Sequence, residues 1–324
     1  MNDWDIIGHD WAVRRLRRAI EQGQLAQSHL FVGPPSIGKA TLALALARAL
    51  LGHNDRARAL VNQRRHPDLL WVEPADEGEA IKVEQIRELL HALTLAPVES
   101  RHRVAVVSDA HLITESGQNA ILKTLEEPNP SAVIVLTAPN TDALLPTIVS
   151  RCQLLNLRPA PVRVVEEALL ARGVAGERAA LIARLSRGRI GWALRAIKDD
   201  AMLEARAERL RDLRALLTAG RTQRFAYAEK LARAEPSHVA QTLEDWLLLW
   251  RDVARATGRP AAPEALVNAD QRDWIAQLAN ELSIAQVAAL LRAIGQTLQY
   301  LDRNVNPRLA LDVLLLKLPR LPAS

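Results

Sequence analysis

The stretch Gly33-Pro-Pro-Ser-Ile-Gly-Lys-Ala40 has the residue types and spacing of a phosphate-binding loop. Glycines let backbone N–H groups curl around phosphate oxygens, and Lys39 would add a positive charge at the start of a helix. An apolar run ends at Val32 and a helical pattern begins at Lys39, which is the context that such a loop needs. The sequence therefore predicts phosphate binding by Gly33, Gly38 and Lys39. The alternative is a tight strand-to-helix turn without a ligand.

The residues that would handle a magnesium ion are missing from their usual places. Ala40 stands where Ser or Thr would bind the metal, and Thr41 follows it, rotated by roughly 100° about the helix axis. After the apolar run Val104–Val107, Ser108 and Asp109 occupy the positions at which an Asp holds Mg²⁺ and a Glu polarises the attacking water. Asp109 is therefore predicted either to orient water weakly or to cap the following segment.

A second cationic site lies in Leu145-Pro-Thr-Ile-Val-Ser-Arg-Cys152. An arginine such as Arg151 can serve the nucleotide of a neighbouring subunit. The alternative is that Arg151 pairs with Glu126 or Glu127 of its own domain. Together with the incomplete phosphate loop, Arg151 indicates a stator, which is a subunit that completes another subunit's ATPase site while hydrolysing little or no ATP itself.

The elements that must position these residues alternate between β-rich runs and helical patterns from Asp5 to about Pro159, which predicts a three-layer α/β domain with a parallel sheet. The predicted strands are Leu30–Val32, Leu69–Val72, Val104–Val107, Val133–Thr137 and Gln153–Asn156. The predicted helices are Trp11–Glu21, Lys39–Leu51, Val83–Leu93 and Glu115–Glu127.

A proline-rich connection, Leu157-Arg-Pro-Ala-Pro161, predicts a domain boundary. Every later pattern is helical, so the fold class is α/β plus all-α. Short helices are predicted over Val162–Arg172, Glu177–Leu185 and Gly191–Lys198, and they suit a small lid. The predicted domains are residues 1–160, 161–201 and 202–324.

Longer helices are predicted from about Met202 to Leu318 because apolar residues recur every three or four positions. One apolar stripe consists of Leu243, Trp246, Leu247, Trp250 and Val253. A stripe of this kind is predicted to be core rather than a binding face. The segment Gly258–Pro263 is predicted to be a loop.

Composition bounds the class of protein. The 324-residue chain is 49% hydrophobic, which suffices for two or three packed domains. No apolar run approaches the roughly 20 residues that cross a bilayer, and the acidic start Met1–Asp5 is unlike a signal peptide. We therefore expect a soluble cytoplasmic protein. Its one cysteine, Cys152, excludes an intramolecular disulfide, and its net charge of +5 cannot by itself argue for DNA.

Seven motifs, taken in order, resemble those of the bacterial DNA polymerase III clamp-loader subunits. They are Ile6-Ile-Gly-His9, Ser28-His-Leu-Phe31, Gly33-x4-Gly-Lys39, His66-Pro-Asp68, Asn119-Ala-Ile-Leu-Lys-Thr-Leu-Glu-Glu-Pro128, Ser150-Arg-Cys152 and Asn304-Val-Asn-Pro307. The resemblance covers essentially the whole chain. It implies an AAA+ module, a helical lid and a C-terminal helical collar. The collar would join tau or gamma motor subunits and the delta subunit in a five-membered ring that closes a sliding clamp around primed DNA.

Within such a ring, the resemblance implies that Arg151 reaches into the ATP site of the adjacent motor subunit. Motor subunits carry a lid arginine, and the matching stretch Gly188–Leu194 has Gly191 at that place, while Arg189 lies two residues earlier and points elsewhere. This departure, with those at Ala40 and Ser108, favours a non-motor member.

Two other functions are alternatives to that of a non-motor clamp-loader subunit. One is an active clamp-loader ATPase in which Thr41 and Asp109 rescue the positioning of metal and water. The other is an unrelated phosphotransferase with a phosphate loop, which leaves the helical C-terminal third unexplained. For the non-motor reading, ATP and Mg²⁺ are expected to bind without efficient hydrolysis or not at all.

Two further expectations concern zinc and DNA. Many family members carry four cysteines after the phosphate-loop helix, but Leu51–Arg65 has none. His53 and His66 cannot make a structural tetrahedral site alone, so we predict no zinc and interpret both as solvated loop residues. Lys123 and Arg87 are candidates for contact with the DNA backbone, with ordinary exposed helical charges as the alternative.

Overall fold

The computed structural model of the chain describes residues 4–76, 78–258, 266–303 and 305–322. It divides into two compact units. One contains Met1–Arg172 and Ser186–Ala193, and the other contains Gly173–Leu185 and Leu194–Ser324. The three domains predicted from the sequence, with boundaries after residues 160 and 201, stay a prediction.

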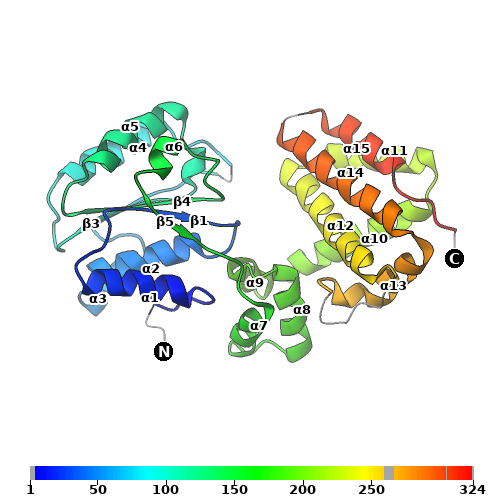
Figure 1. Cartoon of the computed structure of the whole chain (residues 1–324), viewed down its shortest axis with the longest axis horizontal. Coiled ribbons are helices and arrows are strands. Elements are labelled where there is room, and N and C mark those ends of the chain that lie inside the picture. The colour runs from blue at the N-terminus through cyan, green and yellow to red at the C-terminus, as the bar shows by residue number, and fades with distance from the viewer. Residues whose placement is uncertain (1–3, 77, 259–265, 304, 323–324) are drawn as a thin grey trace. The chain divides into compact units, whose positions relative to one another are not determined.

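The first unit is built on a five-stranded sheet with the strand order β2-β3-β4-β1-β5 (Figure 1). The strands are β1 Ser28–Val32, β2 Leu69–Val72, β3 Arg103–Val107, β4 Ala132–Ala138 and β5 Gln153–Asn156. Neighbouring strands are parallel throughout. The central strands β3, β4 and β1 are buried along their whole length, which is why their sequences are continuous apolar runs. The predicted parallel α/β fold is confirmed.

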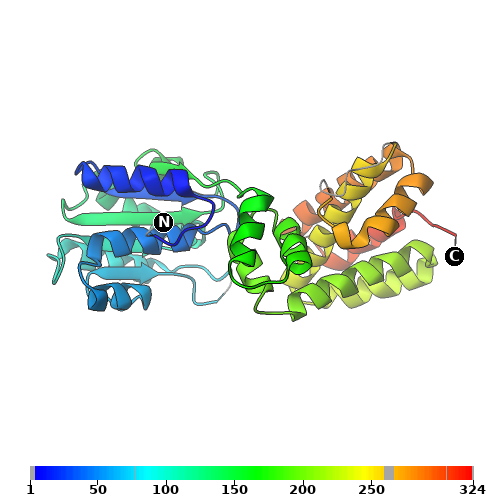
Figure 2. The ribbon, with the colours of Figure 1, turned by 90° about the horizontal axis from the view of Figure 1, so that it is seen from below.

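Helices cover both faces of this sheet, and side chains that alternate along the strands face two separate cores. One layer consists of α1 Asp10–Glu21, α2 Lys39–Leu51 and α3 Asp55–Asn62, and Figure 2 views the unit from this side. The other layer consists of α4 Val83–Thr94, α5 Glu115–Glu126 and α6 Pro146–Val149 (Figure 1). Four of these helices were predicted, and the short helices α3 and α6 were not.

The parallel arrangement brings the carboxyl ends of neighbouring strands to one edge of the sheet. Val32 at the end of β1 lies opposite Ala138 at the end of β4, and Val107 at the end of β3 lies opposite Leu136. The loops that leave β1, β3 and β4 therefore start side by side. They carry the phosphate loop and the pair Ser108 and Asp109.

Beyond the sheet the described chain is helical, as predicted. Three short helices come first: α7 Val162–Leu170, α8 Gly176–Ser186 and α9 Ile190–Ala196. Longer elements follow: α10 Ala201–Thr218, α11 Arg221–Ala232, α12 Pro236–Ala256, the 3₁₀ helix η3 Ala269–Gln271, α13 Arg272–Glu281, α14 Ile284–Asp302 and α15 Pro307–Leu316.

A large apolar core holds the second unit together. In the predicted stripe on α12, Leu243, Trp246, Trp250 and Val253 are completely buried, and Leu247 packs against the same core partly exposed. The interpretation of this stripe as core is confirmed. None of the described helices is by itself long and apolar enough to cross a membrane, although α13 with η3 and α14 together pass on length and composition as a pair bent by 116°.

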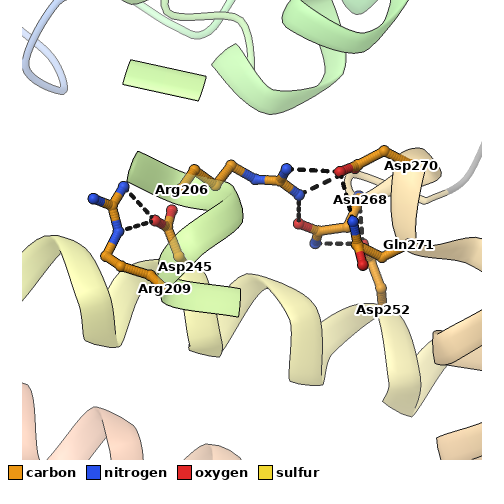
Figure 3. A network of polar contacts seen from close by, with 7 residues as sticks. All are labelled: Arg206, Arg209, Asp245, Asp252, Asn268, Asp270 and Gln271. Atoms are coloured by element: carbon orange, nitrogen blue, oxygen red, sulfur yellow. Dashed lines mark hydrogen bonds and ion pairs between the residues drawn. The ribbon is translucent and has the colours of Figure 1, made fainter. Parts of the chain in front are cut away.

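A buried polar network ties α10 to α12 and to the segment before η3 (Figure 3). The guanidinium of Arg206 donates to Asp270 at 2.8 Å and to the side-chain oxygen of Asn268 at 2.5 Å. Asn268 in turn donates through its backbone and side chain to Asp252 of α12, at 2.7 and 2.8 Å. Each buried charge thus meets polar partners, as burial of a charge requires.

Two predicted features lie partly outside the described residues. They are residues 259–263 of the predicted loop and Asn304 of the last motif. The described part of that motif begins α15: Asn306 accepts a hydrogen bond from the backbone N–H of Leu309 at 3.3 Å, and Pro307 is the first helical residue. Both residue types favour a helix start.

Candidate functional site

The phosphate loop connects β1 to α2, and two glycines are required by its backbone. Gly38 is the N-cap of α2 with a φ of 109°, a conformation that favours glycine. At Gly33 an added Cβ would lie 2.6 Å from the backbone oxygen of Leu157. The loop therefore has the strand–turn–helix geometry that its sequence predicts.

Lys39 is directed back onto its own loop. Its Nζ donates to the backbone oxygens of Gly33 at 2.8 Å and Pro34 at 3.1 Å, and the residue is 8% exposed. Burial lowers the pKa of Lys39, and the nearby carboxylate of Asp109 opposes this shift. The ammonium group thus donates hydrogen bonds to carbonyl oxygens of its own loop, and a phosphate would have to compete with these oxygens for it.

His9 belongs to one of the sequence motifs but had no predicted role. It contacts the phosphate loop through a hydrogen bond. Its Nε2 lies 2.8 Å from the backbone oxygen of Ile37 and donates to it in the tautomer that this contact requires. His9 is 1% exposed, and burial lowers its pKa. The neutral ring therefore fixes the turn immediately before Gly38.

The structure places Asp109 at the N-cap position of the segment after β3, where its charge acts on Lys39. Burial lowers the pKa of His111, which Asp109 opposes and Lys39 reinforces, so these three side chains share one electrostatic environment. Asp109 precedes the 3₁₀ helix η1 Ala110–Leu112, yet its side chain makes no capping hydrogen bond. The prediction that the Asp109 side chain caps this segment is therefore wrong. Instead, the backbone N–H of Asp109 donates to Thr137 Oγ1 at 3.0 Å.

The contact with Thr137 was missed from the sequence. Thr137 is 1% exposed near the end of the buried strand β4. A hydroxyl at the end of an otherwise apolar run was the available signal. It holds the backbone of the segment that follows β3, because an N–H group removed from water needs an acceptor.

The donors present do not fit a bound magnesium ion. Ala40 offers no ligand, Thr41 is exposed on α2, and Ser108 is a buried, uncharged residue. Across residues 4–76, 78–258, 266–303 and 305–322, no three His, Cys, Asp or Glu side chains are grouped to hold a metal. Carboxylate ligands are what Mg²⁺ normally uses in proteins.

The segment around Gly191 packs tightly against the phosphate loop. The backbone N–H of Gly191 donates to the Ser36 oxygen at 2.8 Å, and an added Cβ would lie 2.8 Å from that oxygen. A side chain therefore cannot stand at Gly191 unless the loop moves. Arg189 donates through Nε to the backbone oxygen of Ser186 at 3.0 Å, within its own turn.

Arg151 lies just beyond α6 and is exposed. Its Nη1 donates to the backbone oxygen of Thr147 at 3.0 Å, and its Nη2 forms an ion pair with Glu126 Oε1 at 2.5 Å. The side chains of Arg151 and Glu126 are 33% and 49% exposed. The chain thus contains the pairing within its own domain that the sequence offered as an alternative, at a surface where other groups can reach the arginine.

The motif His66-Pro-Asp68 builds a buried turn. His66 is 2% exposed, so its interpretation as a solvated loop residue is wrong, whereas His53 is exposed as predicted. Asp68 accepts backbone N–H groups of residues 98, 99 and 100 at 2.6 to 2.9 Å. Burial raises the pKa of Asp68, but these hydrogen bonds and Arg103 outweigh it and hold the pKa below its ordinary value.

The remaining predicted residues have ordinary surroundings. Lys123 on α5 and Arg87 on α4 are exposed, and their contact with DNA stays a prediction. Burial raises the pKa of the Cys152 thiol to about 12, so it is protonated at neutral pH.

Comparison with known proteins gives matches along most of the chain. A family model described as DNA polymerase III, delta subunit, matches residues 8–161, and a model of the C-terminal part of the same subunit matches residues 201–319. The delta prime subunit of Bacillus subtilis DNA polymerase III is 28% identical over 317 residues, which cover 94% of each chain. The delta prime subunit of Pseudomonas aeruginosa is 29% identical and covers 93% of this chain and 94% of its own.

The gamma/tau subunits match about half of the chain. That of Mycobacterium tuberculosis strain H37Rv is 32% identical over 179 residues, which cover 52% of this chain and 30% of that protein. The delta prime subunits, in contrast, match the α/β part and the helical part together. This distribution favours the delta prime relatives over the gamma and tau relatives. The chain belongs to the delta prime family of DNA polymerase III, an AAA+-related family of clamp-loader subunits that is related to gamma and tau.

Proposed function

We propose that this chain is the stator of a DNA polymerase III clamp loader and that Arg151 acts in trans on the ATP bound by an adjacent gamma or tau subunit. The observation that carries this proposal is the exposed guanidinium of Arg151, in a chain that has Ala40 where a metal-binding hydroxyl would stand and Ser108 where a metal-binding carboxylate would stand. A guanidinium suits this role because its planar N–H donors match phosphate oxygens.

The expected contribution of Arg151 is large. An arginine that reaches a transferring phosphoryl group from a neighbouring chain stabilises the charge of the transition state and accelerates turnover by about 10³- to 10⁵-fold. The ion pair with Glu126 does not prevent this, because exposed ion pairs contribute only about 0–1 kcal/mol. A polyphosphate, which carries several negative charges, can therefore replace Glu126 as the partner of Arg151.

For the chain's own pocket we propose at most weak ATP binding by Gly33, Gly38 and Lys39, without efficient hydrolysis. The exposure of Thr41 on α2 and the engagement of Lys39 with loop carbonyls support this view. No observation favours the alternative of an active ATPase that relies on Thr41 and Asp109. The absence of zinc also stays a prediction.

The proposed partners are the gamma or tau subunits and the delta subunit. The helices of residues 202–324 would serve as the collar that joins them, and the sliding clamp and primed DNA would be met through the complex in the cytoplasm. The support is the match of the delta prime relatives over this helical part as well as over the α/β part.

Reconstitution with gamma or tau and delta subunits tests the proposal. Arg151→Ala should lower the ATPase rate of the complex and leave its mass unchanged. Arg172→Ala is a matched control, because Arg172 is also exposed and also donates to a carbonyl four residues earlier. Its complex should hydrolyse ATP at the normal rate. Normal turnover with Arg151→Ala, or loss of assembly, would refute the proposed role.

A further inference from the structure

The two motifs that end in Glu-Glu-Pro128 and Ser-Arg-Cys152 are joined in space by one ion pair. Glu126 is the last residue of α5, and its carboxylate meets Nη2 of Arg151 at 2.5 Å. At the other end of α6, the side-chain oxygen of Gln118 on α5 accepts the backbone N–H of Leu145 at 3.1 Å. The short helix α6 is therefore fastened to α5 on both sides, and Glu126 provides the fastening at the arginine.

The contacts of Arg151 direct the guanidinium without using all of its donors. Nη1 donates to the backbone oxygen of Thr147 at 3.0 Å and approaches Ser150 Oγ at 3.4 Å, while Nη2 faces Glu126. A guanidinium has five N–H donors, so these contacts leave others available. One third of the side chain stays exposed.

We infer that Glu126 is a positioning residue for Arg151: it holds the guanidinium in place on the end of α6 before a phosphate of the neighbouring subunit arrives. This inference rests on the proposed trans role of Arg151. A long, unrestrained side chain loses much rotamer freedom when it binds, and a residue that holds it beforehand reduces that loss. Because the pair is exposed, it positions the arginine without trapping it.

The test uses Glu126→Gln in the reconstituted complex, with Glu127→Gln as the matched control. Glu127 is the next residue, has the same side chain and is also exposed. Glu126→Gln should lower kcat for ATP about two- to fivefold and leave KM unchanged, because the lost interaction acts through Arg151 in the transition state. Glu126→Asp, which keeps the charge, should recover part of the rate. Glu127→Gln should behave as the unchanged complex.

A double-mutant cycle separates this inference from the proposed function. In the Arg151→Ala background, Glu126→Gln should have no further effect on kcat. If Arg151→Ala lowers turnover but Glu126→Gln leaves it unchanged or raises it, the positioning role is wrong and the trans role stands. If Arg151→Ala has no effect, the proposed function itself fails.

Discussion

The cation of the phosphate loop, Lys39, and the cation at the end of α6, Arg151, differ in burial and in partners. Lys39 is 8% exposed and donates to two carbonyl oxygens of its own loop, whereas the Arg151 side chain is 33% exposed and meets one half-exposed carboxylate. A buried cation with internal partners contributes to the fold and is costly to redirect. An exposed cation with a weakly held partner can exchange that partner for a group of another molecule at little cost in free energy. The difference shows that Lys39 is engaged within its own loop while Arg151 stays accessible at the surface, as the proposed trans role requires.

If buried polar groups contribute to the fold, as the comparison indicates, removing one of them should lower the free energy of unfolding. We expect the largest effect at Asp68. Asp68→Ala removes the acceptor of three backbone N–H groups and leaves Arg103 buried beside it without its carboxylate. We expect the free energy of unfolding to fall by about 3–5 kcal/mol. Urea denaturation of the purified chain measures this change. A loss as small as that of an exposed ion pair would break the comparison.

Acid should lower the free energy of unfolding through a second buried group, His29. Burial lowers the pKa of His29 from 6.5 to about 4, so the unfolded chain binds the proton first. Stability is therefore complete above the unfolded value and is lost as the pH falls toward the folded value. We expect a loss of about 2 kcal/mol between about pH 7 and pH 5. His29→Leu should remove this loss, and His53→Gln, at an exposed histidine, should keep it.

The packing of Gly191 against the phosphate loop should give a moderate effect. Gly191→Ala places a Cβ 2.8 Å from the Ser36 oxygen and should lower the free energy of unfolding by about 1–3 kcal/mol. Gly176→Ala is the control, because an added Cβ there meets nothing within 4 Å. Denaturation of both variants decides the question. Equal stabilities would mean that the phosphate loop moves to make room for a side chain at Gly191. The loop that holds Lys39 would then be less rigid than the comparison implies.

The smallest effect is expected at the surface. Glu126→Gln removes the partner of Arg151, but both side chains are substantially exposed. The free energy of unfolding of the isolated chain should change by less than about 1 kcal/mol. A loss near that expected for Asp68→Ala would mean that the ion pair is structural, and it would weaken the case that Arg151 is available to a partner.

The sheet could be predicted closely because its buried strands are continuous apolar runs between helical patterns. Helix α2 was predicted to its exact bounds, since Gly38 and Gly52 flank it. The short helices α3 and α6 of the α/β unit were missed. Periodicity needs more turns than α6 provides, whereas Asn54 caps α3 with a side-chain hydrogen bond at 2.8 Å and could have indicated it.

The candidate site was predictable in its residues but not in its contacts. Spacing identified the loop of Gly33 to Lys39, and yet the return of Lys39 to its own carbonyls depends on local packing. The choice of Glu126 over Glu127 as the partner of Arg151 required the positions of α5 and α6. The burial of His66 followed from long-range contacts that a single sequence does not contain.

The most direct test compares Arg151→Ala with Lys39→Ala, each reconstituted with gamma or tau and delta subunits and checked for intact mass. Single-turnover ATP hydrolysis at the site that this chain serves should fall by about 10³-fold or more with Arg151→Ala. With Lys39→Ala it should remain unchanged. The opposite result, hydrolysis lost with Lys39→Ala and retained with Arg151→Ala, would contradict the account.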